Sequence, residues 1–299
     1  MKRLIVTADD FGAAPEVNEA VEAAHRDGIL TAASLMVAGP AAADAVTRAH
    51  RLPSLRVGLH LTLVEGRPLL PASKVHHLID KGGDFRSDMA RLGAEVAFSR
   101  RLRRQMAAEI TAQFAAFHAT GLALDHCNAH KHFHLHPVLG SLMASIGARF
   151  GLKAVRVPSE PQRVLRRVDP VTGWRPALLA GPLERTLRQQ LRARGIQAPE
   201  RSFGCRWSGR MTQRRLAGLI RHLPDGVNEI YLHPATGGYA SGAAGYRYRE
   251  ELEALLAPDT LAACRSAAVR LGGFSDFLTA DRLAACPASP AAYPERLRS

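Results

Sequence analysis

Short apolar segments alternate with amphipathic segments along most of this chain, and this alternation restricts the folds open to it. The first apolar segment, LIVTADDFG (4–12), suits a buried strand, and PEVNEAVEAAHRDG (15–28) after it suits a helix. Pro15 stands at the first position of that helix and Gly28 at its end, where these residues are favoured. Repetition of strand and helix in this order predicts a parallel sheet, either open or closed into a barrel.

The same pattern continues through most of the chain. We expect further strands over 31–39, 55–66, 122–130, 153–160 and 228–235, and further helices over 40–52, 102–121, 137–151, 215–223, 249–258 and 260–273. The segment 66–86 carries the prolines and glycines of a loop. We therefore expect one α/β domain over residues 1–278, a deformed TIM-type (β/α) barrel with a basic helical insertion around 160–200. The Ala-, Pro- and Arg-rich segment 279–299 is expected to be a flexible tail.

Charge and composition limit the classes of partner. The net charge of the 299-residue chain is +13 at pH 7, and arginines cluster over 100–104, 163–167 and 185–194. Such clusters suit a nucleic acid, an anionic membrane surface or merely a basic composition. Aromatic residues make up only 6% and do not interleave with the arginines, which argues against single-stranded nucleic acid. No apolar run is long enough for a transmembrane helix, and the four cysteines form no CxxC motif, so we expect a reduced, cytoplasmic protein.

Polar side chains stand at the ends of several expected strands. In parallel α/β folds, ligands bind at the C-terminal ends of the strands. The side chains at these ends are Asp9 and Asp10, His60, Asn128 with His130, Arg156, and His233. We therefore expect them to gather at one end of the sheet.

Asp9 and Asp10 are adjacent, and adjacent residues of a strand point to opposite faces. The two carboxylates can share a site only if the strand stops there, and Phe11-Gly12 supplies the turn because glycine tolerates unusual backbone angles. One carboxylate would then bind a metal ion while the other deprotonates a water molecule. Capping of the following helix is the structural alternative for either residue.

Five of the thirteen histidines lie close together, at His126, His130, His132, His134 and His136. An extended segment would place the last four on one face, whereas a turn into the helix opened by Pro137 would bring His130 and His134 together. At most two are expected as metal ligands. Together with one aspartate and His60, which alone would be a core histidine, they indicate an open, catalytic metal site. Imidazole ligands favour zinc, and the carboxylate also admits magnesium.

Five motifs, in this order, resemble the YdjC/ChbG-type carbohydrate deacetylases: TADDFG, GLHLTL, the histidine-rich segment after DHCNAH, VRVP and EIYLHPA. The resemblance extends from about residue 3 to about residue 277. That family consists of metal-dependent enzymes that remove N-acetyl groups from amino sugars. Three further segments resemble the hopanoid-biosynthesis-associated (HpnK-like) branch: ASLMVAGPAAADAV, NAHKHFHLHP and FGCRWSGRMT. This resemblance implies N-acetylglucosaminyl hopanoids as substrates.

The resemblance implies a role for each strand-end residue. Asp10, His60 and His130 would bind one divalent metal ion, Mg or Zn. Asp9 would be the general base, His233 would protonate the leaving amine, and Arg156 would orient Asp9. The residues expected to contact substrate or to support the ligands are His132, His134, Asn128 and Phe11. Asn128-Ala129 stands where many family members have Asp-Ser, and the segment 160–200 is longer and more basic than in a minimal member.

The HpnK-like branch implies a glycolipid substrate that is held in a membrane. Basic helices at 100–117 and 183–194 would then contact an anionic surface, peripheral to the inner membrane, with a solvated basic helix face as the alternative. No nucleic acid is expected as a partner, and a homodimer is left open. The alternative functions are deacetylation of soluble chitooligosaccharides, a metal-dependent phosphoesterase activity, and metal-dependent binding without catalysis.

Overall fold

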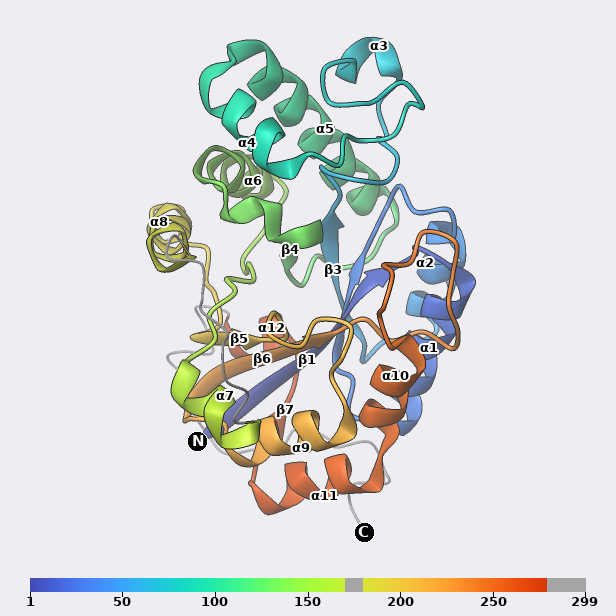
Figure 1. Ribbon diagram of the computed structural model, residues 1–299, viewed down its shortest axis with the longest axis vertical. Coiled ribbons are helices and arrows are strands. Elements are labelled where there is room, and N and C mark those ends of the chain that lie inside the picture. Colours follow the sequence, from blue (N-terminus) through green and yellow to red (C-terminus); the bar gives the residue numbers. More distant parts are fainter. Residues whose placement is uncertain (170–179, 279–299) are drawn as a thin grey trace.

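The computed structural model describes residues 1–169 and 180–278 (Figure 1). In this part of the chain, seven parallel strands form one sheet: β1 (Lys2–Phe11), β2 (Ala32–Leu35), β3 (Arg56–Leu61), β4 (Cys127–Ala129), β5 (Arg201–Phe203), β6 (Gly226–Leu232) and β7 (Arg270–Leu271). The order is β4-β3-β2-β1-β6-β5, with β7 paired to β1. β7 pairs with the start of β1, at Arg3 and Leu4, because β2 pairs with β1 only from Thr7 onward.

The sheet is curled, and an irregular segment spans the gap between β4 and β5. Within this segment, Val155 makes a parallel bridge to Cys127, and Ser159 makes an antiparallel bridge to Ser202. Arg156 lies between the two bridges, which brings its guanidinium to Asp9 on β1. The expected α/β barrel-like fold is confirmed.

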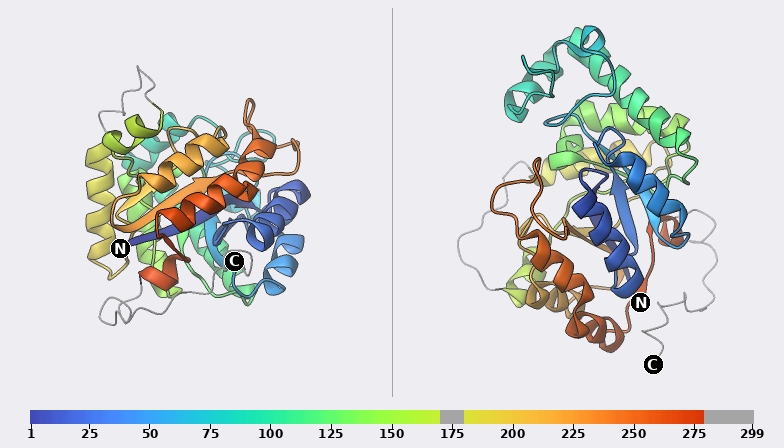
Figure 2. Two further views of the ribbon diagram at one scale, coloured as in Figure 1. Left: turned by 90° about the horizontal axis from the view of Figure 1, so that it is seen from below. Right: turned by 90° about the vertical axis from the view of Figure 1, so that its right-hand side faces the viewer.

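The helices lie outside the sheet. They are α1 (Pro15–Asp27), α2 (Ala42–His50), α3 (Ala72–Val75), α4 (Met89–Phe98), α5 (Arg100–Ala119), α6 (Pro137–Arg149), α7 (Gln162–Val168), α8 (Ala180–Arg192), α9 (Gln213–Arg221), α10 (Tyr248–Leu256), α11 (Pro258–Ser266) and α12 (Phe274–Phe277), with the 3-10 helix η1 (His130–Leu135). α9, α10 and α11 pack together at one end of the molecule, and α3, α4 and α5 form a lobe at the other (Figures 1 and 2).

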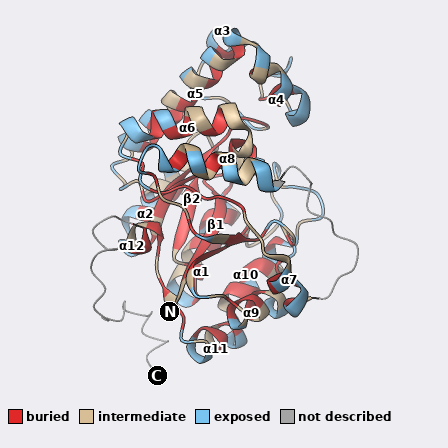
Figure 3. Ribbon diagram, turned by 90° about the vertical axis from the view of Figure 1, so that its left-hand side faces the viewer, coloured by how far each residue is buried: buried red, intermediate tan, exposed pale blue. Residues whose placement is uncertain are grey.

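The strands are buried on both faces, as is usual for the parallel sheets of α/β proteins. In β1 every residue from Leu4 to Phe11 is buried, and β1 and β2 appear almost wholly red in Figure 3. Burial of the strand ends has a consequence for polar residues there. A charged side chain at such a place must find a partner, because an unpaired buried charge is costly.

Several expected elements differ in extent from the structure. The strand expected over 153–160 forms only isolated bridges, and the one expected over 122–130 is reduced to β4. The helix expected over 260–273 ends at Ser266, because the chain turns there to form β7. The expected insertion contains α7 and α8, while residues 170–179 and the expected tail 279–299 lie outside the described residues. In the described part of the chain, no helix is long and apolar enough to cross a membrane.

Candidate metal centre and active site

The end of β1 turns at Asp10 itself. Asp10 has φ +63° and Gly12 has φ +94°, so the reversal begins one residue earlier than the expected Phe11-Gly12 turn. The pairing of β1 with β2 shifts register between Ala8 and Phe11. The Gly12 N–H donates to Asn18 Oδ1 at 2.8 Å, which holds the turn against α1. Both carboxylates therefore lie at the same end of the sheet, and both line one cavity.

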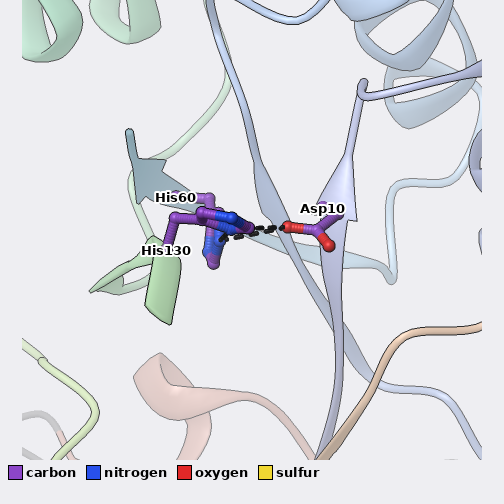
Figure 4. Close-up of side chains that lie close together, drawn as sticks. All are labelled: Asp10, His60 and His130. Atoms are coloured by element: carbon purple, nitrogen blue, oxygen red, sulfur yellow. Dashed lines mark hydrogen bonds and ion pairs between the residues drawn. The ribbon is translucent and has the colours of Figure 1, made fainter. Parts of the chain in front are cut away.

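Asp10, His60 and His130 come from β1, β3 and the start of η1, and their side chains converge (Figure 4). Asp10 Oδ1 lies 3.2 Å from His60 Nε2 and 3.3 Å from His130 Nδ1. The two ring nitrogens are 3.4 Å apart. Asp10 Oδ1 is buried and has no partner in hydrogen-bonding geometry. One carboxylate oxygen and two imidazole nitrogens that face a common point suit a divalent cation such as zinc.

The hydrogen bonds of His60 leave its metal-facing nitrogen free. His60 Nδ1 lies 2.6 Å from Asn128 Oδ1, which can only accept, so Nδ1 carries the proton and Nε2 has the lone pair. The Asn128 amide is oriented in turn, because its Nδ2 donates to Asp9 Oδ1 and to Ser34 Oγ, both at 3.2 Å. Partners of this kind fix the ring of a metal-binding histidine.

Asp9 belongs to a buried charge network with Arg156 and Glu229. Arg156 donates to both Asp9 oxygens, at 2.5 and 2.9 Å, and its Nε donates to Glu229 Oε1 at 2.8 Å. Burial opposes ionisation of Asp9, but Arg156, with smaller contributions from His60 and His233, outweighs it, so the pKa of Asp9 lies well below its usual range. Tyr231 packs on the guanidinium, with its ring centroid 4.2 Å from Arg156 Cζ. Asp9 is thus an oriented, ionised carboxylate.

The histidine-rich segment adopts neither of the two expected arrangements. Lys131 and His132 have φ of +52° and +55°, so η1 is kinked, and successive histidines leave it in different directions. His130 turns toward Asp10, His132 Nε2 lies 2.7 Å from the Tyr231 hydroxyl, and the His134 ring donates to the Arg156 carbonyl at 2.9 Å. One histidine of this segment therefore joins the metal group, and the next two lie around Arg156.

The remaining predicted residues differ in their access to solvent. His132 lines the cavity beside Asp9, whereas His134 is buried behind it, and burial lowers the pKa of His134 to about 4. Asn128 is buried between Asp9 and His60. Phe11 is fully buried in the hydrophobic core, away from the lining of the cavity.

His233 follows β6 and lines the same cavity as Asp9 and Asp10. Its backbone N–H donates to Glu251 Oε2 at 2.6 Å. Its ring Nδ1 is buried without a hydrogen bond and lies 4.0 Å from the same carboxylate oxygen. Burial lowers the pKa of His233, and the carboxylates of Asp10 and Asp9 act in the opposite direction.

Two cavities meet at the metal group. One, of about 380 Å³, is lined by Asp9, His132 and His233 and by a group of tyrosines: Tyr231, Tyr239, Tyr246 and Tyr248. The other, of about 520 Å³, has a more apolar wall: Ala13, Met36, Ala38 and Pro40. Asp10 and His130 line both. A ligand bound at the metal group could therefore extend to either side of it.

Sequence reasoning missed several residues of this site. Glu229 has no exposed surface and accepts hydrogen bonds from Thr7, Ser202 and Arg156. A glutamate inside the apolar strand NEIYLHPA was a signal that could have identified it. Glu251 is buried and comes from α10. The acidic sequence around it resembles that of an ordinary solvent-exposed helix, so nothing in the sequence marked it. Glu65 lies 3.9 Å from His130 Nε2, and nothing in the loop sequence marks it.

Comparisons with known proteins agree with this architecture. The family model described as YdjC-like protein matches residues 3–266. A carbohydrate deacetylase of Vibrio vulnificus (strain CMCP6) is 32% identical over 272 residues, which cover 87% of this chain and 89% of the relative. The carbohydrate deacetylase of Geobacillus stearothermophilus is 30% identical, covering 91% and 97%. A solved structure from Enterococcus faecalis V583, named for cellobiose-phosphate cleavage, has a TM-score of 0.71 at 19% identity and covers 93% of this chain and 99% of its own.

Proposed function

Because this chain belongs to the YdjC-like protein family, we propose that it is a carbohydrate deacetylase that uses one divalent metal ion to remove the N-acetyl group of an amino sugar. The observation that carries the proposal is the convergence of Asp10, His60 and His130 next to the Asp9–Arg156 pair. This arrangement combines a site for a Lewis acid with an oriented base, which hydrolysis of an amide needs.

Asp10, His60 and His130 would hold the metal ion. When bound, a divalent ion polarises the acetyl carbonyl and makes a water molecule more acidic. The donors limit which ion it is: two imidazole nitrogens favour zinc, and the carboxylate with an open position also admits magnesium. Burial opposes ionisation of Asp10, but the contacts with His130 and His60 outweigh it and lower the pKa of Asp10, so the ligand is charged over the physiological range.

Asp9 is the proposed general base and takes the proton of the attacking water. Both of its oxygens accept from Arg156, which holds the carboxylate in one orientation and in its ionised form. Because its pKa is low, Asp9 is a weak base. It would therefore accept a proton efficiently only from a water molecule whose acidity a bound metal ion has increased. Arg156 acts through Asp9 and is a positioning residue.

His233 is the proposed general acid, which gives a proton to the departing amine nitrogen. It lines the cavity that also contains Asp9, and its backbone is fixed by Glu251. A ring whose pKa is lowered by burial is a stronger acid when protonated. His132 lines the same cavity and is proposed to contact the sugar, while His134 and Asn128 support Arg156 and His60.

The finer proposal is that the amino sugar belongs to a glycolipid, an N-acetylglucosaminyl hopanoid. It is based on the motifs shared with the HpnK-like branch. The apolar wall of the larger cavity supports it, because Met36, Ala38 and Pro40 offer a surface for an apolar aglycone beside the metal group. The cavity with the tyrosines would then take the sugar ring, since aromatic side chains pack well on sugar faces.

Acetate release by the purified, metal-loaded protein tests the proposal. An N-acetylglucosaminyl hopanoid and soluble chitobiose would be supplied side by side, with the apoprotein as control. Acetate from the glycolipid alone supports the finer proposal. Acetate from chitobiose alone keeps the deacetylase and rejects the glycolipid. Absence of acetate from any N-acetylated sugar, with metal bound, would reject the deacetylase in favour of another hydrolase, such as a phosphoesterase, or of a metal-dependent binding protein.

A further inference from the structure

The lobe formed by α3, α4 and α5 projects from the sheet (Figure 1). Four large hydrophobic side chains are exposed in the described part of the chain, and three of them lie on this lobe or on the loop that leads into it: Leu69, Met89 and Phe98. Phe98, the last residue of α4, is 89% exposed. A phenylalanine ring exposed to this degree is accessible to an apolar partner, and the adjacent charges indicate which kind.

Arginines follow Phe98 directly. α5 begins at Arg100 and contains Arg101, Arg103 and Arg104 in its first two turns, with no acidic residue in the first turn. The N-terminal end of a helix is the positive end of its dipole, so these cations destabilise the helix where they stand. Residues that are locally unfavourable for stability, as these arginines are, often lie at functional sites.

These arginines also lack the partners that other arginines of the lobe have. Arg86 and Arg91 pair with Asp88 and Glu95, at distances from 2.6 to 3.9 Å. Arg100, Arg103 and Arg104 make no ion pair with any described residue, and Arg101 hydrogen-bonds only the His76 ring, at 3.0 Å. Arg100, Arg101 and Arg104 are exposed, and Arg103 is half-buried. The lobe therefore presents one uncompensated cationic patch beside its most exposed aromatic side chain.

We propose that this surface, Phe98 with Arg100, Arg101, Arg103 and Arg104, docks onto an anionic lipid bilayer. Insertion of a phenylalanine ring at the boundary of the acyl chains is favourable because it buries apolar surface. Arginine guanidinium groups bind lipid phosphates while their methylene groups remain in apolar surroundings. A second copy of the chain fits less well, because a two-fold contact would bring the same arginines face to face. Nucleic acid fits less well because a single exposed ring provides no series of stacking platforms.

The second basic helix of the chain differs from this surface. In α8, Arg188 donates to the carbonyls of Pro199 and Glu200 at 3.0 Å, so part of its charge has an internal role. The lobe, in contrast, is joined to the candidate active site through its connecting loop. The loop that leads into it contributes Glu65, Gly66 and Arg67 to the larger cavity, which Asp10 also lines. If the proposed function holds, a docked lobe would place this cavity close to a lipid-linked sugar, whereas the docking itself does not depend on that function.

Flotation of the full-length protein with vesicles tests the docking. Vesicles of phosphatidylcholine alone would be compared with equal parts of phosphatidylcholine and phosphatidylglycerol. We expect binding only to the anionic vesicles, and a loss of about 100-fold in the triple variant Arg100→Gln, Arg103→Gln, Arg104→Gln. Phe98→Ser should weaken binding about tenfold. The matched control is Arg163→Gln, Arg166→Gln, Arg167→Gln, which removes the same charge from exposed positions of α7, toward the other end of the molecule (Figures 1 and 3).

The outcomes separate docking from general electrostatics and from misfolding. Loss in the α5 variant with binding retained in the α7 variant supports the proposal. Equal loss in both variants, or no flotation of the wild-type protein, would overturn it. So would a gel-shift assay in which the wild-type protein binds DNA while it fails to float with the anionic vesicles. Quenching of a Phe98→Trp variant by brominated lipids, above the wild-type signal, reports insertion independently of the charge variants. Acetate release from a soluble substrate should be unchanged in the α5 variant, so failure of docking and failure of the deacetylase are distinguishable.

Discussion

At the scale of single residues, the two adjacent aspartates have different surroundings and should have separable functions. Asp10 faces His60 and His130, whereas Asp9 is held by Arg156. We expect Asp10→Asn to weaken metal binding and activity together. Asp9→Asn should leave metal binding intact and lower turnover by about 10²–10⁴-fold, the usual contribution of a general base. Calorimetric titration with zinc and with magnesium, together with acetate release, measures both effects.

A control is needed because Asp9→Asn also removes one partner of a buried guanidinium. Glu229→Gln removes the other partner of Arg156 without altering a residue that lines the cavity. We expect it to lower the free energy of unfolding by about 3 kcal/mol, as does breaking other buried ion pairs. Turnover below the melting temperature should fall far less than in Asp9→Asn. If both variants lose turnover equally, Asp9 acts through the stability of the network and not as the base.

At the scale of elements, α10 is tied to the end of β6 by one carboxyl group. Glu251 accepts from the backbone N–H groups of Met211 and His233, at 2.8 and 2.6 Å, and burial raises its pKa from 4.5 to about 8. The folded protein then binds this proton more tightly than the unfolded chain does. Its contribution to stability is complete below pH 4.5 and is lost as the pH rises through about 8.

The prediction concerns the pH dependence of unfolding in Glu251→Gln. The amide loses one of the two backbone hydrogen bonds, which costs about 1–3 kcal/mol at every pH. In the wild-type protein, Glu251 makes the free energy of unfolding decrease as the pH rises from 4.5 to about 8. This decrease should be absent from the variant. Denaturant titrations of both proteins at a series of pH values give the difference curve. A difference that does not change with pH would mean that Glu251 is ionised throughout.

The contact between β3 and β4 depends on a glycine. A Cβ atom at Gly58 would lie 2.5 Å from the backbone oxygen and the ring of His126, and that oxygen already accepts from Leu59 N. Since a backbone oxygen cannot rotate away, we expect Gly58→Ala to destabilise the protein by about 1–3 kcal/mol. Gly181→Ala in the first turn of α8 is the control, because nothing lies within 4 Å of an added Cβ there, so the change in stability should be small. Thermal unfolding of both variants tests the contrast, and equal melting temperatures would contradict it.

At the scale of the whole molecule, local signals predicted the fold class and the longer elements. α1 extends from Pro15 to Asp27, one residue short of the predicted end. It could be predicted because a proline marks its start and Gly28 follows its last residue. The gathering of Asp10, His60 and His130 followed from strand ends that share one edge of a parallel sheet. Patterns that depend on several consecutive residues, or on a general rule of the fold, were therefore visible in the sequence.

Other features depend on contacts between distant segments. β5 and β7 have three and two residues, too few for any periodicity. The kink of η1 rests on left-handed backbone at Lys131 and His132, a conformation that is uncommon for residues other than glycine and that nothing in the local sequence marks. Glu229 stands out in the sequence as a glutamate within an apolar strand, but its pairing with Arg156 depends on the fold.

The boundary at residue 278 is our proposal for the end of the domain, and it makes a prediction about truncation. Phe274, Phe277 and Leu278 are buried with Ile5 and Val227 in a small core. Asp125 accepts from the N–H groups of Phe274 and Ser275.

A chain that ends at Leu278 keeps all of these contacts, so we expect it to unfold at the temperature of the full chain and to bind metal equally well. A chain that ends at Gly273 loses both phenylalanines. Each buried phenylalanine contributes about 3–5 kcal/mol, so the loss approaches the whole stability of a domain, and this chain should not fold. Circular dichroism melts and zinc titration of the two truncated chains decide the matter. A lower melting temperature for the chain that ends at Leu278 would assign part of the tail to the domain.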